Sequence, residues 1–112
     1  MAGRTVTYLS YESYASLAIK TILEIIKEAR NHNASTLQAN DSKIVIHHIL
    51  GECPIGETSI IIGVSSAQRL GAFELCQNLL ERVKKDVQIW KREYYADGGD
   101  PCWKENFPTI TL

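Results

Sequence analysis

Cysteine is scarce in this chain, and the few cysteines do not fall into a metal-binding or disulfide pattern. The three cysteines, Cys53, Cys76 and Cys102, are widely separated and never form a CxxC pair. An odd number at such spacings argues against a disulfide framework, and the absence of CxxC spacing argues against a zinc site. The pattern therefore predicts reduced thiols in a cytoplasmic protein, with no bound metal.

Long hydrophobic runs, an N-terminal targeting pattern and an excess of one charge are also lacking. No stretch approaches the roughly 18 consecutive apolar residues of a membrane span, and the N-terminus has no basic-then-apolar signal pattern. With 12 basic and 13 acidic residues, the formal net charge is −1, and no long block of like charge occurs. These absences argue against a membrane protein and against a nucleic-acid-binding face driven by bulk charge. Any anion site must therefore be local.

Length and composition predict one domain. At 112 residues with 45% apolar content, the chain is long enough for one modest core and too short for two. Repeats and low-complexity segments are absent. The expected fold class is therefore a single α/β or α+β domain over residues 1–112.

The first half of the chain predicts two strands separated by a helix. Residues 5–9 alternate like a strand, which we expect to close at residues 10–13. A second strand is predicted over residues 43–50, after a polar, Asn-rich loop at 31–42. Between the strands, apolar side chains recur at three- and four-residue steps, which is typical of an amphipathic helix lying on a sheet. These apolar positions are Ala15, Ala18, Ile19, Ile22, Ile25, Ile26 and Ala29.

The middle of the chain predicts a turn and then a strand. Pro54 and two glycines indicate a turn or crossover within residues 51–57. The β-branched run at residues 58–64 follows, and we interpret it as a buried central strand.

A second helix is predicted next. Ser65 and Ser66 are suitable N-cap residues, and the helix should end near Lys85 or Asp86. Its expected apolar stripe consists of Ala72, Phe73, Cys76, Leu79, Leu80, Val83 and Val87. After it we expect an extended segment at 88–95, a turn at 96–101 and a tail containing Trp103.

Basic residues flank this second helix and suggest an anion site. Arg69 projects close to the direction of the apolar stripe in the first turn, where the helix N–H groups add positive potential. Its alternative role is to pair with a carboxylate such as Glu57 or to cap a strand end. Lys84 flanks the stripe at the other end, with its stem able to pack and its amine free to reach a cleft. Lys85 points away from the core and should be solvated.

Lys91 lies in the extended segment after the helix. Alternation places its side chain on the opposite face from Trp90. If Arg69, Lys84 and Lys91 converge on one pocket, they would hold an anionic substrate, and two adjacent amines would lower the pKa of one of them enough for acid/base or nucleophilic chemistry. The alternative is an ordinary helix C-terminus with favourable cations.

Histidine and cysteine suggest no further catalytic group. His47 and His48 are adjacent in a strand, so one faces inward and one outward, which argues against a metal pair. The interior one is expected to be a hydrogen-bonded core histidine. Cys76 should be inert packing on the helix, whereas Cys53 and Cys102 are expected in loops, with no neighbouring base to make either a nucleophile.

Four stretches of the sequence resemble one family, the large, catalytic subunit of molybdopterin synthase. The most specific is the run 89–93, Ile-Trp-Lys-Arg-Glu, with Lys84 seven residues before Lys91. The other three lie in family order over nearly the whole chain. They are Leu9-Ser10-Tyr11-Glu12-Ser13-Tyr14, then His48-Ile49-Leu50-Gly51 with Ile55-Gly56-Glu57, then Val64-Ser65-Ser66-Ala67-Gln68-Arg69.

The resemblance implies an α/β hammerhead fold with two helices packed on a mainly antiparallel sheet. It also implies a homodimer of large subunits with a ubiquitin-like small subunit at each outer end. The C-terminal Gly-Gly of that partner carries a thiocarboxylate, which enters a pocket of the large subunit and delivers sulfur to cyclic pyranopterin monophosphate. Two such transfers build the dithiolene of molybdopterin. The implied activity is that of a sulfurtransferase that needs no metal or other cofactor.

The resemblance also implies roles for individual residues. Lys84 and Lys91 match the two active-site lysines of the family, and Arg69 matches its anion-binding arginine. Gln68 stands where the family usually has histidine, and it can hydrogen-bond but cannot act as an acid or base near neutral pH. Lys91 and Lys84 are therefore the expected catalytic residues, and substrate binding is expected from Arg69, Gln68, Lys84 and Lys91. Cations suit a phosphate-bearing substrate and an anionic sulfur donor.

Two further departures from the family leave an alternative open. Family members begin earlier, with a strand and an arginine-bearing segment, and this chain starts at the equivalent of the following strand. The tail after Trp103 offers Lys104 but no match to the arginine that the family can supply across its dimer. The alternative is therefore a truncated or divergent, non-catalytic member that keeps only the dimer and partner interfaces.

Overall fold

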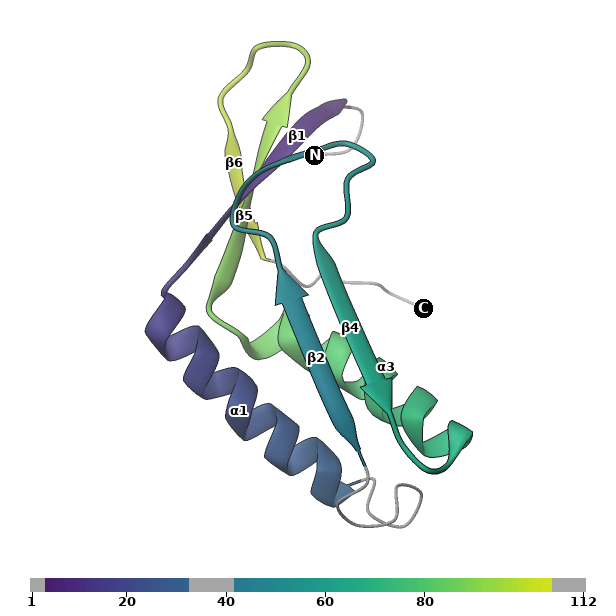
Figure 1. Ribbon diagram of the computed structural model, residues 1–112. Helices are drawn as coiled ribbons and strands as arrows, with labels where there is room; N and C mark the ends of the chain where they lie inside the picture. The colour runs from purple at the N-terminus through teal and green to yellow at the C-terminus, as the bar shows by residue number, and fades with distance from the viewer. Residues whose placement is uncertain (1–3, 33–41, 106–112) are drawn as a thin grey trace.

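The computed structural model describes residues 4–32 and 42–105. Along the chain, six strands and two helices follow one another in these residues (Figure 1). The strands are β1 (Val6–Ser13), β2 (Lys43–His48), β3 (Gly51–Pro54), β4 (Ile60–Ser65), β5 (Ile89–Tyr95) and β6 (Cys102–Glu105), and the helices are α1 (Ala15–His32) and α3 (Arg69–Asp86). Most of the predicted loop at 31–42 lies outside the described residues.

The strands form two sheets. One has four strands in the order β3-β1-β5-β6, and the other is the pair β2-β4. Every neighbouring pair of strands is antiparallel, which confirms the predicted class of two helices with a mainly antiparallel sheet. The molecule is elongated, at 51 × 31 × 23 Å. In Figure 1 the four-stranded sheet occupies the upper part, and the helices and β2-β4 occupy the lower part.

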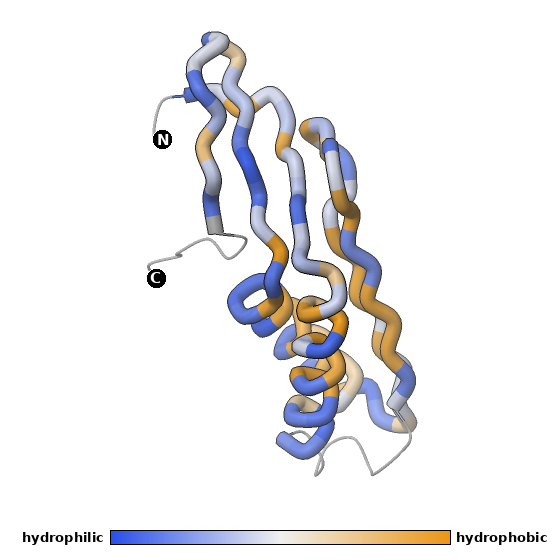
Figure 2. The backbone as a smooth tube through the Cα atoms, turned by 90° about the vertical axis from the view of Figure 1, so that its left-hand side faces the viewer, coloured by the Kyte–Doolittle hydropathy of each residue, from blue (hydrophilic) through white to orange (hydrophobic). Residues whose placement is uncertain are grey.

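The hydrophobic core lies where α1, α3 and the β2-β4 pair meet. Figure 2 shows this concentration of apolar residues along the helices and the β2-β4 pair, whereas the four-stranded sheet is mixed in hydropathy. The largest fully buried side chains are Ile25 of α1 and Leu75, Leu79 and Val83 of α3. Burying four such side chains contributes on the order of 1.5–3 kcal/mol each, so the two helices hold the fold together.

Helix α1 begins at Ala15, the first of the predicted apolar positions, but it continues to His32, two residues into the predicted loop, and it does not bury its whole predicted stripe. Ala18, Ile25 and Ala29 are buried, as their spacing predicts. Ile19, also assigned to that stripe, is 60% exposed, and Leu23 one turn later is 62% exposed. The helix therefore has a buried face and a separate apolar strip on its surface.

Helix α3 buries a narrower stripe than the sequence predicts. Its buried residues are Gly71, Leu75, Leu79 and Val83, a four-residue repeat along one line of the helix. Phe73 was assigned to the core, but it is 70% exposed. The sequence prediction was wrong here because the centre of its stripe lay between this buried line of residues and the next line around the helix. It also left out Leu75.

The first turn of α3 also differs from the prediction. The N-cap residue is Gln68, without a side-chain capping bond, and not Ser65 or Ser66. Ser65 still belongs to β4, and the Ser66 hydroxyl donates to the carbonyl oxygen of Gln68 at 2.6 Å instead. The predicted C-terminal limit at Asp86 is confirmed.

Several strands depart from the sequence prediction. β1 continues through Ser13 because Glu12 and Ser13 still pair with Trp90 and Ile89 of β5. Most of the predicted turn at 51–57 is a short strand, β3, which begins at Gly51 and is followed by a turn containing Gly56. The two glycines have φ of 83° and 89°, conformations that glycine adopts most readily. Cys53 is consequently buried in a strand and not placed in a loop.

The other two departures concern β4 and β6. β4 was predicted to be a buried central strand, but among the described strands it pairs with β2 alone, and Ile61 on its outer face is 59% exposed. A run of β-branched residues cannot by itself distinguish a strand buried on both faces from one buried on a single face. The tail containing Trp103 forms β6, which pairs with β5.

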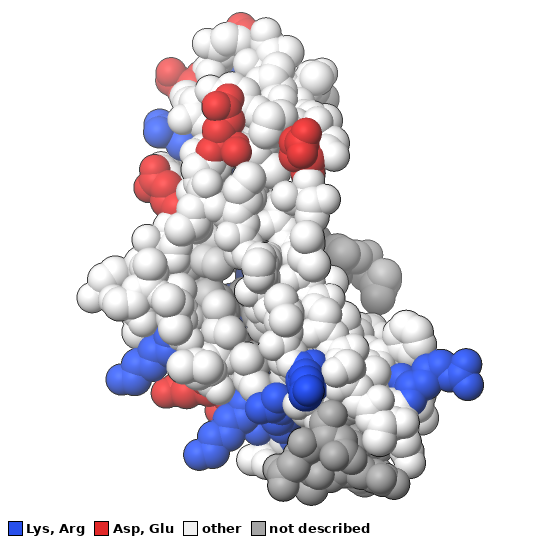
Figure 3. Space-filling model, in the orientation of Figure 1, with Lys and Arg blue, Asp and Glu red and all other residues white. Residues whose placement is uncertain are grey.

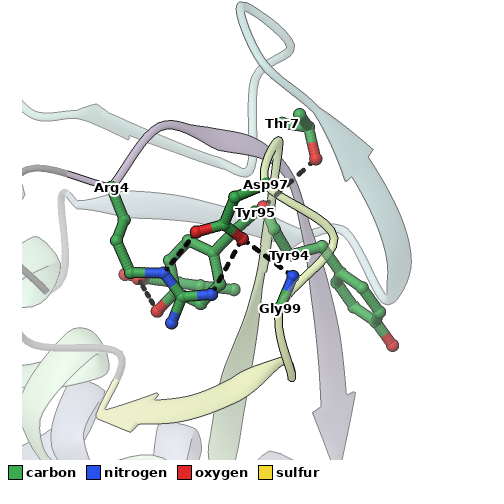
Figure 4. A network of polar contacts seen from close by, with 7 residues as sticks. Arg4, Thr7, Tyr94, Tyr95, Asp97 and Gly99 are labelled. Atoms are coloured by element: carbon green, nitrogen blue, oxygen red, sulfur yellow. Dashed lines mark hydrogen bonds and ion pairs between the residues drawn. The ribbon is translucent and has the colours of Figure 1, made fainter.

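A polar network ties the start of β1 to the turn between β5 and β6 (Figure 4). Arg4 donates from Nε and Nη2 to the two carboxylate oxygens of Asp97, at 3.1 and 3.0 Å, and its guanidinium lies 3.6 Å from the ring centroid of Tyr95. Gly99 donates its backbone N–H to the same carboxylate at 2.8 Å. This bidentate pair lowers the pKa of Asp97. The network therefore fixes the hairpin that carries β5.

Candidate active site

Tyr11 lies at the centre of the candidate site. It is 5% exposed in β1 and lies directly opposite Lys91 of β5 in the antiparallel register, so both side chains project from the same face of the sheet. The imidazole of His48 stands edge-on to the Tyr11 ring, with the centroids 4.8 Å apart and the planes at 71°. The two sheets therefore meet at this aromatic contact, with Lys91 beside it.

His48 is held in one orientation. Its Nδ1 lies 2.7 Å from the carbonyl oxygen of Ile49 and must donate there, because a carbonyl only accepts. Burial lowers the pKa of His48, the bond to Ile49 opposes this, and the charge of Lys84 lowers the pKa further. His48 is half-buried and His47 is exposed, which confirms the expectation of one inward and one outward histidine.

Lys84 approaches the same region from the last turn of α3. It is half-buried, whereas Lys85 is exposed, as the helical geometry predicts. A pocket of about 440 Å³ opens where α3 passes into β5. Its lining residues are Lys84, Lys85, Asp86, Val87, Gln88, Ile89 and Trp90.

The two lysines reach the site by different routes. Lys84 comes from the end of α3, and Lys91 comes from β5, where it follows Trp90, which is 47% exposed. Alternation along the strand places Trp90 on the other face from Lys91. Within residues 4–32 and 42–105, neither lysine forms an ion pair with a carboxylate. Two half-buried ammonium groups without a carboxylate partner suit an anionic ligand.

Arg69 and Gln68 lie elsewhere. Arg69 begins α3 and Lys84 is in its last turn, fifteen residues on, which is about 22 Å at a rise of about 1.5 Å per residue. Arg69 is exposed, not aligned with the buried stripe. The predicted convergence of Arg69 with both lysines is therefore wrong within one chain, because the arginine and Lys84 occupy opposite ends of the same helix.

Sequence reasoning missed Tyr11 as a residue of this site and gave His48 only a structural role. Tyr11 was placed in the segment that closes the first strand, because its pairing with β5 joins segments about eighty residues apart, for which short-range patterns carry no signal. Alternation along the strand indicated that one of His47 and His48 is interior, without showing which. The position of His48 against Tyr11 depends on how the two sheets pack.

The described residues contain neither a metal-binding cluster nor a membrane-spanning helix. In the part of the chain that the structure describes, no group of three or more His, Cys, Asp or Glu side chains is arranged to hold a metal ion. Neither described helix is both long and apolar enough to cross a bilayer. On the face seen in Figure 3, acidic side chains gather over the upper part and most basic ones over the lower part.

Comparison with known proteins identifies the family. The profile of the MoaE protein family matches residues 1–86, which is most of the chain. The chain belongs to the MoaE family.

Curated relatives carry the names of molybdopterin synthase subunits. Molybdopterin synthase catalytic subunit 1 of Aedes aegypti is 41% identical over 105 residues, covering 93% of this chain and 64% of the relative. The catalytic subunit of Dictyostelium discoideum is 38% identical over 104 residues, covering 93% of this chain and 63% of the relative. The chain thus spans a little under two thirds of these MoaE relatives.

Solved structures of the MoaE family have the same fold. Molybdopterin synthase from Staphylococcus aureus superimposes with a TM-score of 0.79 at 29% identity, covering 93% of this chain and 70% of that one. A complex of subunits 1 and 2 of molybdopterin-converting factor from Helicobacter pylori gives a TM-score of 0.66 at 22% identity, covering 83% of this chain and 58% of that one. At that identity the second match supports the fold alone.

Proposed function

We propose that this chain is a catalytic subunit of molybdopterin synthase. It takes sulfur from the C-terminal thiocarboxylate of a ubiquitin-like small subunit and transfers it to cyclic pyranopterin monophosphate, forming the dithiolene of molybdopterin in the cytoplasm. The observation that carries the proposal is the arrangement of Lys84 and Lys91 around Tyr11 and His48. Membership of the MoaE family and the catalytic-subunit relatives support it.

The two lysines have complementary tasks in this proposal. Both reactants are anions, and opening of the cyclic phosphate develops further negative charge, which fixed ammonium groups stabilise in a partly desolvated site. Lys91 projects from a strand paired on both sides and is the more rigidly placed cation. Lys84 comes from the last turn of a helix, where a longer reach suits substrate capture.

Tyr11 and His48 support the lysines. The buried ring of Tyr11 forms an apolar surface beside Lys91. Burial and the charge of Lys84 both favour the neutral imidazole of His48, which adds no positive charge to repel the ammonium groups. The site therefore concentrates its charge on the two amines. Less water around them strengthens their attraction for an anion.

Arg69 and Gln68 require a second copy of the chain to take part in substrate binding. Leu70 and Phe73, in the same turn of α3, are 61% and 70% exposed, an apolar surface of the kind that a partner chain covers. A homodimer that buries this turn would carry Arg69 and Gln68 toward the lysines of the other copy. The small subunit would then bind elsewhere on each large subunit.

The decisive experiment is reconstitution. The purified chain is mixed with thiocarboxylated small subunit and cyclic pyranopterin monophosphate, and the dithiolene product is measured. Product in proportion to the chain supports the proposal. A chain that binds the small subunit without forming product would instead be the non-catalytic member considered above, and a Lys91→Ala variant sets the background.

A further inference from the structure

Four strands place a row of residues across the candidate site. In the register of the four-stranded sheet, Gly51 lies opposite Tyr11, Tyr11 opposite Lys91, and Lys91 opposite Lys104 of β6. Directly opposed residues of antiparallel strands project from the same face, with Cβ atoms about 4.5–5.5 Å apart. Lys104 therefore shares the face of Tyr11 and Lys91, and it is half-buried like Lys91.

This pairing is unfavourable unless something compensates for it. Like charges directly opposite one another destabilise a sheet. The carboxylate two residues further along β5 on this face, Glu93, accepts a hydrogen bond from the Tyr95 hydroxyl at 2.9 Å. Neither Lys91 nor Lys104 forms an ion pair with any carboxylate in the described part of the chain.

Nearby aromatic rings do not take up the charge of Lys104 either. The cation–π contacts described on this sheet are made by arginines. Arg92 lies 5.2 Å from the ring centroid of Trp103, on the opposite face from Lys91, and Arg4 lies over Tyr95. Two opposed ammonium groups thus remain on the face that carries the candidate site.

We propose that Lys104 is a third cation of this site and that Lys91 and Lys104 together bind one oxyanion of the reactants. The inference rests on the function proposed above and extends it to a residue of β6. A bound phosphate or carboxylate between the two amines would convert their repulsion into two charge-assisted hydrogen bonds. Both reactants supply such a group, the pterin as a phosphate and the small subunit as its C-terminal carboxylate or thiocarboxylate.

Anion binding by the chain without its partner tests the proposal, so the result does not depend on turnover. Thermal unfolding is followed while inorganic phosphate, or a short peptide ending in Gly-Gly, is titrated into the wild type, Lys104→Gln, Lys104→Arg and Lys27→Gln. Lys104→Gln should weaken binding of at least one probe about tenfold, the effect of roughly one charge-assisted hydrogen bond. Lys104→Arg, which keeps the charge, should retain most of the binding. Lys27→Gln removes an exposed lysine of α1, outside the pocket beside Lys84, and should match the wild type.

The two probes separate the possible ligands. Weakened phosphate binding assigns Lys104 to the pterin phosphate, and weakened peptide binding assigns it to the carboxyl end of the small subunit. If Lys104→Gln binds both probes as tightly as the wild type does, the proposal is wrong. That result would not contradict the roles proposed for Lys84 and Lys91, which the reconstitution assay tests separately.

Discussion

The edge of the His48 imidazole meets the ring of Tyr11, and this contact joins the two sheets at the point where the lysines gather. His48 ends β2, and Tyr11 belongs to β1, whose neighbour β5 carries Lys91. Lys84, from α3, is close enough for its charge to lower the pKa of His48. One aromatic contact thus relates four elements of the fold.

Lys91 should be the more important lysine for catalysis. Lys91→Ala should lower product formation by about 10²-fold or more, within the range expected for loss of a proton-transferring side chain. Lys91→Arg should rescue poorly, since a guanidinium keeps the charge but does not give up its proton or act as an amine nucleophile. Dithiolene formation measures both effects, with thermal unfolding as the check on folding. Near-normal turnover by Lys91→Arg would mean that the residue supplies positive charge alone.

Lys84 should act mainly in substrate binding. Lys84→Ala is expected to raise KM for the pterin precursor about tenfold with a smaller fall in kcat, because its flexible stem at the end of α3 suits capture rather than rigid positioning. Steady-state kinetics with saturating small subunit separates the two constants. Lys85→Ala, one residue along and exposed, is the matched control. A fall in kcat at unchanged KM would assign Lys84 to the chemical step instead.

Arg69 should act on the lysines of another copy of the chain. Arg69→Ala and Lys91→Ala should each be inactive alone, but mixing the two variants after subunit exchange should restore about a quarter of wild-type activity. Half of the dimers are then mixed, and one of the two sites in each mixed dimer is intact. Light scattering confirms the dimer. No recovery on mixing, with exchange demonstrated by differently tagged chains, would place Arg69 outside the site.

His48 should make stability depend on pH. Burial lowers its pKa below the ordinary 6.5, so in the window between the two values the unfolded chain binds the proton that the folded chain rejects. The free energy of unfolding should therefore fall as the pH is lowered from about 7 to about 5. His48→Gln should flatten this slope, as measured by urea denaturation at several pH values. An unchanged slope would contradict the prediction.

The effect of Lys84 on His48 has its own test. Replacing Lys84 by Met removes a nearby positive charge and should raise the pKa of His48, which NMR titration of the imidazole follows directly. Lys85→Met should leave that pKa at its wild-type value. Equal titration of His48 in all three proteins would show that Lys84 does not approach the imidazole in solution.

Periodicity alone determined the elements with strong local patterns. The start of α1 and the end of α3 at Asp86 follow from apolar spacing, and the half-buried Lys84 beside the exposed Lys85 follows from helix geometry. The extended segment after α3 was also predicted, and with it the placement of Trp90 and Lys91 on opposite faces. Each of these properties depends on residues only a few positions apart. Resemblance of the Trp-Lys-Arg-Glu run to a known family supplied the expected function.

Only the tertiary structure decided which residues meet. Pairing of β1 with β5 brings Tyr11 opposite Lys91, and pairing of β5 with β6 brings Lys104 there, although these segments are distant in the sequence or separated by a turn. Helix α3 places Arg69 and Lys84 at its opposite ends, although their like charges had suggested that they line one pocket. Strand register and helix placement depend on the packing of the whole chain, because each strand can satisfy its own pattern with several partners. The register of the sheet therefore decides which residues form the candidate site, whereas the sequence pattern only places the lysines along the chain.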